Sequence, residues 1–277
     1  MNGPLARWLF RLTCTALGTA ALGCAAPVQP QPQTTLEVFA AGSLRAALTD
    51  IAKAFEAAEP GTTVRLTFGA SGLLKERLAG GERADVFASA NMEHPQALFA
   101  NGRGGPVRRF AQNRLCVLAP QALPLTPDTL IDRMLDPALK LGTSTPKADP
   151  SGDYAWLMFE RVEQAGRAGA FKALSAKALQ LTGGPQSPPP PAGQSVYGAL
   201  VAQGHADLFV TYCTNAANAL REQPQLKIVT VPAAINVSAS YGLSTLAGAA
   251  PAANRFVEFV LGPTGQGILA RLGFAPA

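Results

Sequence analysis

The sequence predicts an α/β fold of two lobes, with mainly parallel sheets covered by helices and a ligand cleft between the lobes. Short apolar segments alternate with amphipathic segments of helical period from Leu36 onward, as in successive βαβ units. The same alternation restarts after residues 114–120, which indicates a second lobe. Hydroxyl-bearing residues follow several predicted strands, at the carboxyl ends where parallel sheets bind ligands.

The first 26 residues have the pattern of an export signal. Arg7 and Arg11 precede and enter an apolar stretch that is too short for a membrane span and ends in small residues. The segment "AALGC", ending at Cys24, is similar to a bacterial lipobox, so lipidation at Cys24 and ordinary cleavage nearby are both open. Residues 27–35 are expected to form a flexible tether, rich in proline and glutamine. We therefore expect a periplasmic protein, with or without a lipid anchor.

Composition excludes some classes of function. The chain is 48% hydrophobic, and its formal charge of +5 falls to +3 when Arg7 and Arg11 leave with the signal. A small surplus of positive charge spread along the chain argues against nucleic-acid binding. No cysteine or histidine cluster has the spacing of metal ligands, so no direct metal site is expected.

Two cysteines remain in the predicted folded part, Cys116 and Cys213. An oxidising compartment permits a disulfide between them. Buried free thiols are the alternative, since free cysteine packs as a small hydrophobe.

Lobe 1 is predicted over residues 36–113. Its first helix carries an apolar face from Leu44 to Phe55 and stops at Pro60-Gly61. Strands are expected at 36–40, 64–69 and 84–90, followed by helices at 43–61, 73–81 and 93–102.

Lobe 2 is predicted over residues 114–213, and residues 214–277 are expected to return through the hinge and complete the lobes. The chain should cross between the lobes near residues 110–120 and again after Cys213. The proline-rich segment 183–194 is unsuited to a helix or a central strand. Strands are expected at 139–144 and 206–213, and helices at 151–166 and 195–203.

Ser71 stands in "TFGASGLLKERL", between a predicted strand and a predicted helix. A nucleophilic serine at such a turn favours Gly-x-Ser-x-Gly and needs a base. The far glycine, Gly72, is one residue too close, and the contexts of His94 and His205 suit a helix start and a turn. An enzyme is therefore not expected, although a secreted serine hydrolase is kept as an alternative.

Four predicted helices begin with serine, two in each lobe. Amide groups of a helix's first turn lack internal acceptors and lie at its positive end, so an adjacent hydroxyl completes a neutral anion receptor. Each serine alone is explained as a helix N-cap, so the interpretation depends on the four together. The four are Ser43, Ser71, Ser151 and Ser195, and Tyr212 and Thr214 lie at the end of the strand predicted at 206–213.

Several stretches together resemble the periplasmic molybdate-binding proteins of ABC importers, which have the type II periplasmic-binding-protein fold. The resemblance runs from "LEVFAAGSLRAALTDIAKAFE" through "TFGASGLLKERLAGGERADVFASA", "DPSGDYA" and "SVYGALVAQGHADLFVTYCTNA" to "FVEFVLGPTGQGILARLGF". It implies a monomer that binds molybdate or tungstate without a cofactor and delivers it to a membrane permease. It assigns the oxyanion contacts to the hydroxyls of Ser43, Ser71 and Tyr212 and the backbone amides of Ser151 and Val196.

The metal would enter this site only as part of the oxyanion. No lysine, arginine or carboxylate occupies the five positions, so helix ends would compensate the charge and a protonated phosphate would be disfavoured. The sequence departs from the family at "AAGSL", at Asn215 and in 183–194. A binding protein for another small anion or solute is therefore a further alternative.

Overall fold

The computed structural model describes residues 33–188 and 194–277. The predicted export signal, Cys24 and most of the tether lie outside these residues. Within the described part, no helix is long and apolar enough to cross a membrane.

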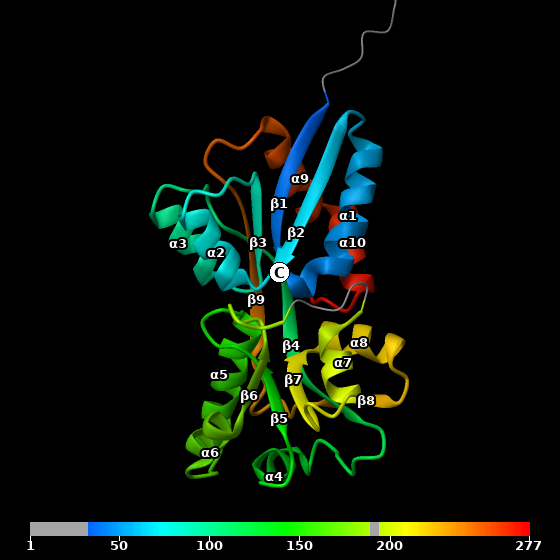
Figure 1. Cartoon of the computed structure of the whole chain (residues 1–277). Helices are drawn as coiled ribbons and strands as arrows, with labels where there is room; N and C mark the ends of the chain where they lie inside the picture. The colour runs from blue at the N-terminus through cyan, green and yellow to red at the C-terminus, as the bar shows by residue number, and fades with distance from the viewer. Residues whose placement is uncertain (1–32, 189–193) are drawn as a thin grey trace, which may run out of the picture. The chain divides into compact units, whose positions relative to one another are not determined.

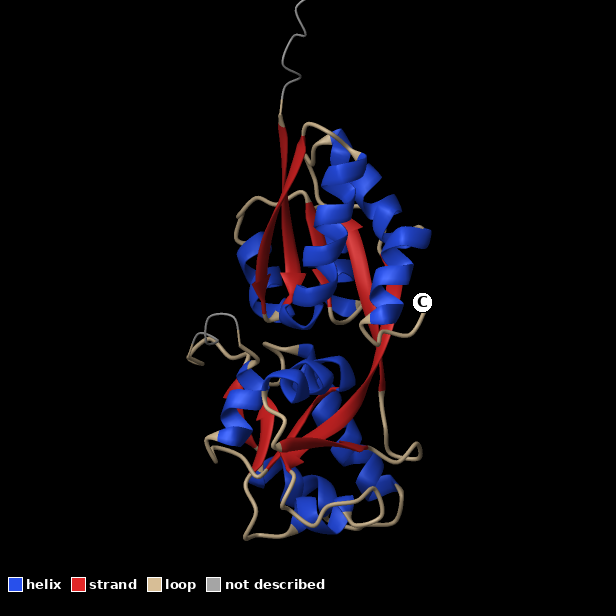
Figure 2. Ribbon diagram, turned by 90° about the vertical axis from the view of Figure 1, so that its right-hand side faces the viewer, coloured by secondary structure: helices blue, strands red, loops and turns tan. Residues whose placement is uncertain are grey.

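The sheet of lobe 1 is built around β1 (Thr34–Ala41), whose apolar residues are largely buried. β1 pairs in parallel with β2 (Thr62–Gly69) and β3 (Val86–Ser89). Figure 2 shows helices on both sides of these strands. The helical elements of this lobe are η1 (Gly42–Leu44), α1 (Arg45–Ala58), α2 (Ser71–Ala79), α3 (Glu93–Ala100), α9 (Pro251–Leu261) and α10 (Pro263–Arg271).

Lobe 2 repeats this arrangement around β5 (Leu141–Ser144). β5 pairs in parallel with β6 (Leu179–Thr182) and β7 (Leu208–Tyr212). Its helices are α4 (Leu130–Leu135), α5 (Pro150–Gln164), α6 (Ala170–Lys177), α7 (Val196–Ala202) and α8 (Cys213–Glu222).

Two strands run between the lobes, β4 (Arg108–Pro120) and β9 (Ser238–Thr245), as Figure 1 shows. They pair with each other in antiparallel fashion. Beyond β9, β4 continues into lobe 2 and pairs with β7 and β8 (Leu226–Thr230). β4 has 13 residues, or roughly 43 Å at the usual rise of a strand, so one strand contributes to both sheets.

The predicted two-lobed α/β fold is confirmed, with parallel pairing of β1 with β2 and β3 in lobe 1 and of β5 with β6 and β7 in lobe 2. The hydrogen-bonded order is β2-β1-β3-β9-β4-β7-β5-β6, with β8 also on β4. Every pair that involves β4 or β9 is antiparallel. The sheet is therefore mixed, because β4 and β9, which link the lobes, also form antiparallel hydrogen-bonded pairs with strands of both lobes.

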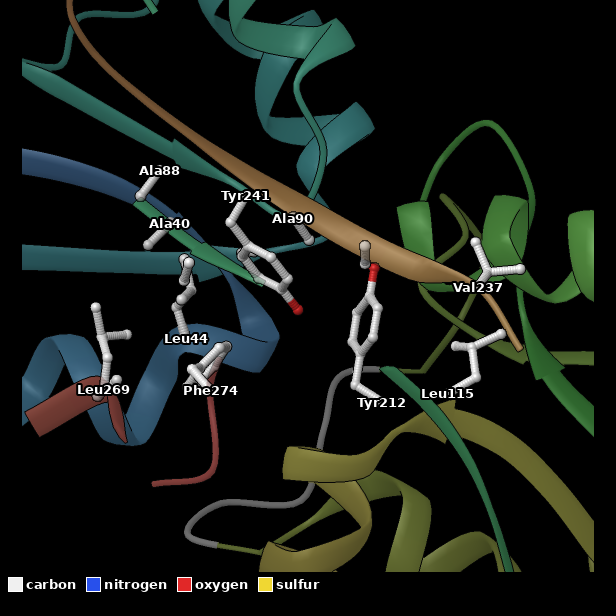
Figure 3. Packing of buried hydrophobic residues seen from close by; sticks show 14 of the residues in the cluster. Ala40, Leu44, Ala88, Ala90, Leu115, Tyr212, Val237, Tyr241, Leu269 and Phe274 are labelled. Carbon is white, nitrogen blue, oxygen red and sulfur yellow. The ribbon is translucent and has the colours of Figure 1, made fainter. Parts of the chain in front are cut away.

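Aromatic side chains pack together in the core of lobe 1 and at the junction between the lobes. Phe55 of α1 makes edge-on contacts with Phe256 and Phe259 of α9. At the junction, the ring of Tyr241 from β9 lies 5.7 Å from that of Tyr212 from β7. Figure 3 shows these two side chains reaching toward each other from the two strands. Both tyrosines are almost completely buried.

Cys116 and Cys213 form a disulfide, the first of the two alternatives for this pair. Cys116 lies on β4 opposite Thr211 of β7, and this pairing brings the two Cα atoms to 4.8 Å. Cys213 begins α8 instead of ending the preceding strand, which corrects the predicted strand boundary. The bond therefore ties the β4 crossing to the residue that follows Tyr212.

Candidate functional site: a cleft between the lobes

A cavity of about 750 Å³ lies between the lobes. Residues that follow the carboxyl ends of β1, β2 and β3 line it from lobe 1, and the starts of α5, α7 and α8 line it from lobe 2. Of the five predicted contacts, four border the cavity: Ser43, Ser71, Val196 and Tyr212. Ser151 does not border it, but Asp149, two residues earlier, does.

Ser71 is the first residue of α2, and the N-cap position before it belongs to Ala70. The Ser71 hydroxyl makes no cap bond to its own helix; it accepts a hydrogen bond of 3.1 Å from the Ala90 amide, just after β3. The alternative of a plain helix cap is therefore wrong. Because a serine hydroxyl both accepts and donates, this arrangement leaves its hydrogen available to a ligand.

The Ser43 hydroxyl lies in η1, 3.0 Å from the Tyr241 hydroxyl. The Asn113 side-chain oxygen accepts from the Arg114 amide, so its nitrogen donates to Thr214 Oγ1 at 2.8 Å and to Tyr241 Oη at 3.4 Å. Because Tyr241 Oη accepts from Asn113, its own hydrogen is available to Ser43, and when Tyr241 donates this bond the Ser43 hydrogen is available to a ligand.

The Tyr212 hydroxyl is buried and has no hydrogen-bond partner among the described residues. An unpaired buried hydroxyl costs about 1–3 kcal/mol, so a partner in the cavity is indicated. Burial raises the pKa of Tyr212, and the neighbouring Tyr241 and Asp149 raise it further. The group is therefore a neutral donor at physiological pH.

Val196 is the first residue of α7. The preceding Ser195 caps the helix by accepting from the Gly198 amide at 3.4 Å, and the Ser195 amide donates to Glu222 at 2.6 Å. Amide groups of a first helical turn lack an acceptor within the helix. Val196 thus brings an amide of this kind to the cavity.

Ser151 follows a carboxylate that the sequence interpretation did not take into account. Asp149 is the N-cap of α5, with Pro150 at the first helical position, and its Oδ1 accepts from the Ser151 amide at 3.0 Å. The amide assigned to an oxyanion is therefore already bound to a carboxylate. The signal was present in "DPSG", since aspartate followed by proline is a common helix start.

None of the five assigned positions holds a carboxylate, but the cavity that surrounds them does, because Asp149 lines it. Burial raises the pKa of Asp149 to about 6, against the opposing effect of the Ser151 amide. Gly183, at a φ of +77°, covers the carboxylate so closely that an added Cβ would lie 2.5 Å from Oδ2. Only glycine suits both this backbone conformation and this approach.

Other polar groups also line the cavity. Asn215, noted above as a departure from the family, is buried, and its side-chain amide donates to Thr211 Oγ1 at 3.1 Å. The charged groups come from two helices and are exposed. They are Arg45 and Asp50 of α1 and Arg221 and Glu222 of α8, none of which the sequence interpretation assigned to the site.

The described residues that line the cavity offer hydrogen-bond donors and no pair of a serine with a histidine base. Among the described residues that line the cavity, none is a histidine, and the recorded partner of Ser71 Oγ is a backbone amide. The described residues also contain no group of three or more His, Cys, Asp or Glu side chains that could hold a metal ion. Binding of an anion by hydroxyls and amides is the chemistry that this geometry supports.

A backbone hydrogen bond joins the two lobes beside the cavity. The Gly72 amide, at the start of α2, donates to the Ala148 carbonyl at 2.9 Å. An added Cβ on Gly72 would lie 2.4 Å from the Lys147 carbonyl oxygen. Lys147 has a φ of 68°, and its amide donates to Asp153 of α5 at 2.6 Å. This contact between the lobes therefore requires glycine at position 72.

Residues 36–275 match the family of bacterial extracellular solute-binding proteins. The uncharacterised protein PM1146 of Pasteurella multocida is 37% identical over 244 residues, which cover 87% of this chain and 99% of the relative. The molybdate-binding protein ModA of Mycobacterium bovis is 29% identical over 248 residues, 88% of this chain and 86% of its own. The solved structure of the sulfate-binding protein SubI from Mycobacterium tuberculosis H37Rv superposes on this chain with a TM-score of 0.74 and 19% identity, over 88% of each chain. At this identity the similarity shows the fold alone.

Proposed function

Because the chain belongs to the bacterial extracellular solute-binding proteins, which serve ABC importers, we propose that it captures a tetrahedral oxyanion and delivers it to a membrane permease. One observation carries this proposal. The buried hydroxyl of Tyr212, which has no hydrogen-bond partner among the described residues, borders the same cavity as the hydroxyls of Ser43 and Ser71. An ionised acceptor makes such hydrogen bonds short and strong.

Molybdate, with tungstate as its equal in size and charge, is the proposed ligand. The resemblance of the site motifs and the 29% identity to a molybdate-binding protein support it. The proposed contacts are those assigned from the sequence: Ser43, Ser71, Ser151, Val196 and Tyr212. They would contact oxygen atoms of the anion and not the metal.

The proposed partner is the permease of an ABC importer, and the protein is proposed to act as a monomer in the periplasm. The proposed lobes are residues 36–113 and 114–213, completed by 214–277. Export through residues 1–26, with or without lipidation at Cys24, is also part of the proposal. Closure of the lobes over the ligand would be a hinge movement in β4 and β9, the strands that connect them.

A second candidate is a binding protein for another small anion. Asp149 favours it, since a carboxylate in the cavity suits a ligand that carries a hydrogen-bond donor.

Titration calorimetry and thermal unfolding of the purified protein with molybdate, tungstate, sulfate and phosphate test the two candidates together. Tight binding of molybdate and tungstate with weak binding of the other two is expected for the first candidate. Preference for sulfate or phosphate would establish the second, and absence of binding by all four would contradict both.

A further inference from the structure

Asp149 brings a carboxylate to the place where the resemblance expects an oxyanion. We propose that the cleft binds an oxyanion together with one proton, which is held between an oxygen of the anion and the Asp149 carboxylate. This inference rests on the proposed function, and it makes Asp149 the residue that decides which protonation state the cleft accepts.

The geometry at the start of α5 carries the proposal. The Ser151 amide is a predicted oxyanion contact, and its hydrogen bond of 3.0 Å to Asp149 Oδ1 puts the carboxylate beside that contact. Asp149 itself borders the cavity. A carboxylate accepts up to four hydrogen bonds, so one amide donor leaves capacity for a donor in the cavity.

Two negative groups this close repel each other strongly in a partly buried site. A proton between their oxygen atoms replaces the repulsion with a hydrogen bond between an acid and an anion. An anion without an acidic hydrogen, such as molybdate or sulfate, must take this proton from the solvent. Hydrogen phosphate brings its own.

The charges around Asp149 do not remove the need for the proton. The buried tyrosines beside it have raised pKa values and are neutral, so they supply hydrogen-bond donors only. Burial already raises the pKa of Asp149 to about 6, so protonation of this carboxylate near neutral pH requires little free energy. The groups that act on Asp149 are the Ser151 amide, Ser144 of β5 and Asp153 of α5, and Lys147 of the preceding loop acts on Asp153. Asp149 in turn acts on Tyr197 and Tyr212. The remaining charged groups, Arg45 and Asp50 of α1 and Arg221 and Glu222 of α8, line the same cavity.

Titration calorimetry with molybdate at pH 7 and pH 8 tests the proposal. Repeating it in buffers of different ionisation heat counts the protons taken up. For the unaltered protein we expect uptake of about one proton and an affinity that falls about tenfold between the two pH values. The affinity for phosphate should change much less over this interval, because hydrogen phosphate carries the proton itself.

The Asp149→Asn variant should bind molybdate without proton uptake and with the same affinity at both pH values. At pH 8 it should bind at least about tenfold more tightly than the unaltered protein, since an asparagine amide donates directly to the anion. Asparagine is also a good helix N-cap, so α5 should keep its start. Asp153→Asn is the matched control: it removes an acid of the same helix that does not border the cavity, and the pH dependence should remain.

Molybdate binding that is independent of pH and takes up no proton would overturn this inference and leave the proposed function standing. Persistence of the pH dependence in Asp149→Asn would also overturn the inference, because it would show that a group other than Asp149 binds the proton. If no oxyanion bound at any pH, the proposed function would fail and this inference with it. If Asp149→Asn did not fold, the proton count in the unaltered protein would decide the matter alone.

Discussion

The two serine hydroxyls proposed to hold the anion each have a protein partner that orients them. Ser71 accepts from the Ala90 amide, and the Ser43 hydroxyl shares a hydrogen bond with the Tyr241 hydroxyl. Such partners hold a binding group in position before the ligand arrives, which lowers the entropy lost on binding. At the scale of the residue, the site is therefore a set of oriented donors, with Asp149 as its one acidic member near a helix start.

Substitution Ser71→Ala should weaken oxyanion binding by about 1.5–3 kcal/mol, the usual range for a hydrogen bond to a charged group. This corresponds to a loss of roughly tenfold to a hundredfold in affinity, measured by titration calorimetry. Ser43→Ala should act alike, and the double variant should be non-additive because both hydroxyls serve one ligand.

Ser244→Ala is the control for these two variants, because Ser244 is also buried but does not border the cavity. Its affinity should match that of the unaltered protein. Unchanged affinity in Ser71→Ala would remove this hydroxyl from the site, and an esterase activity lost on the same substitution would establish the hydrolase alternative.

Asp149 should also make stability depend on pH. The pKa of Asp149 is raised from 3.8 to about 6 in the folded protein. Well below pH 4 the carboxyl group is protonated in both the folded and the unfolded chain, so the raised pKa does not change the free energy of unfolding there. As pH rises toward 6 the unfolded chain releases the proton first, and the folded state loses stability relative to it. Asp149→Asn should therefore increase the free energy of unfolding at pH 7.5 by about 1–3 kcal/mol, and by almost nothing near pH 3.5.

Urea unfolding at the two pH values measures this difference. An equal effect at both values, or a loss of stability at pH 7.5, would contradict a raised pKa for Asp149.

At the scale of the element, the starts of α2 and α5 face each other from opposite lobes. The amide of Gly72 meets the carbonyl of Ala148, one residue before the cap of α5. Both helix starts are also tied to the cavity, through Ser71 and Asp149. Closure of the cleft and assembly of the anion contacts are therefore expected to occur together.

Gly72→Ala should prevent this approach, since its Cβ would lie 2.4 Å from the Lys147 carbonyl oxygen. Within a helix, alanine is favoured over glycine by about 1 kcal/mol, so α2 itself should not weaken. We expect the affinity to fall at least about tenfold, which corresponds to a loss of more than about 1.4 kcal/mol in the stabilisation of the closed state. In the presence of ligand, small-angle scattering should give a larger radius of gyration than for the unaltered protein.

Gly267→Ala in α10 serves as the comparison, because the nearest atom to its added Cβ is the end of a flexible arginine at 3.9 Å. It should leave both measurements unchanged. Normal affinity and normal compaction in Gly72→Ala would show that the contact at Gly72 is not needed for binding.

At the scale of the whole molecule, β4 and β9 hold the lobes together, and the disulfide fastens β4 to the start of α8. The bonded cysteines are 97 residues apart in the sequence. A cross-link over so long a loop restricts the unfolded chain strongly. The stability of lobe 2 is thus expected to depend on an oxidising compartment.

Reduction of the Cys116–Cys213 bond should lower the free energy of unfolding by about 4–5 kcal/mol in the chain-entropy account. Denaturant unfolding with and without a thiol reductant measures this, and the Cys116→Ser, Cys213→Ser double variant should reproduce the reduced protein. Two free thiols in the denatured protein without reductant, or an unchanged midpoint on reduction, would contradict the prediction.

Local patterns in the sequence were enough to predict the alternation of strands and helices, the two lobes and the helix starts at which Ser71 and Val196 lie. These features follow from hydrophobic period and turn chemistry, which act over a few residues. The antiparallel pairing of β4 with β9, the choice between a disulfide and free thiols, and the carboxylate of Asp149 in the cavity were decided only by the tertiary structure. They depend on contacts between segments far apart in the chain, whose strand register and side-chain direction no local pattern determines.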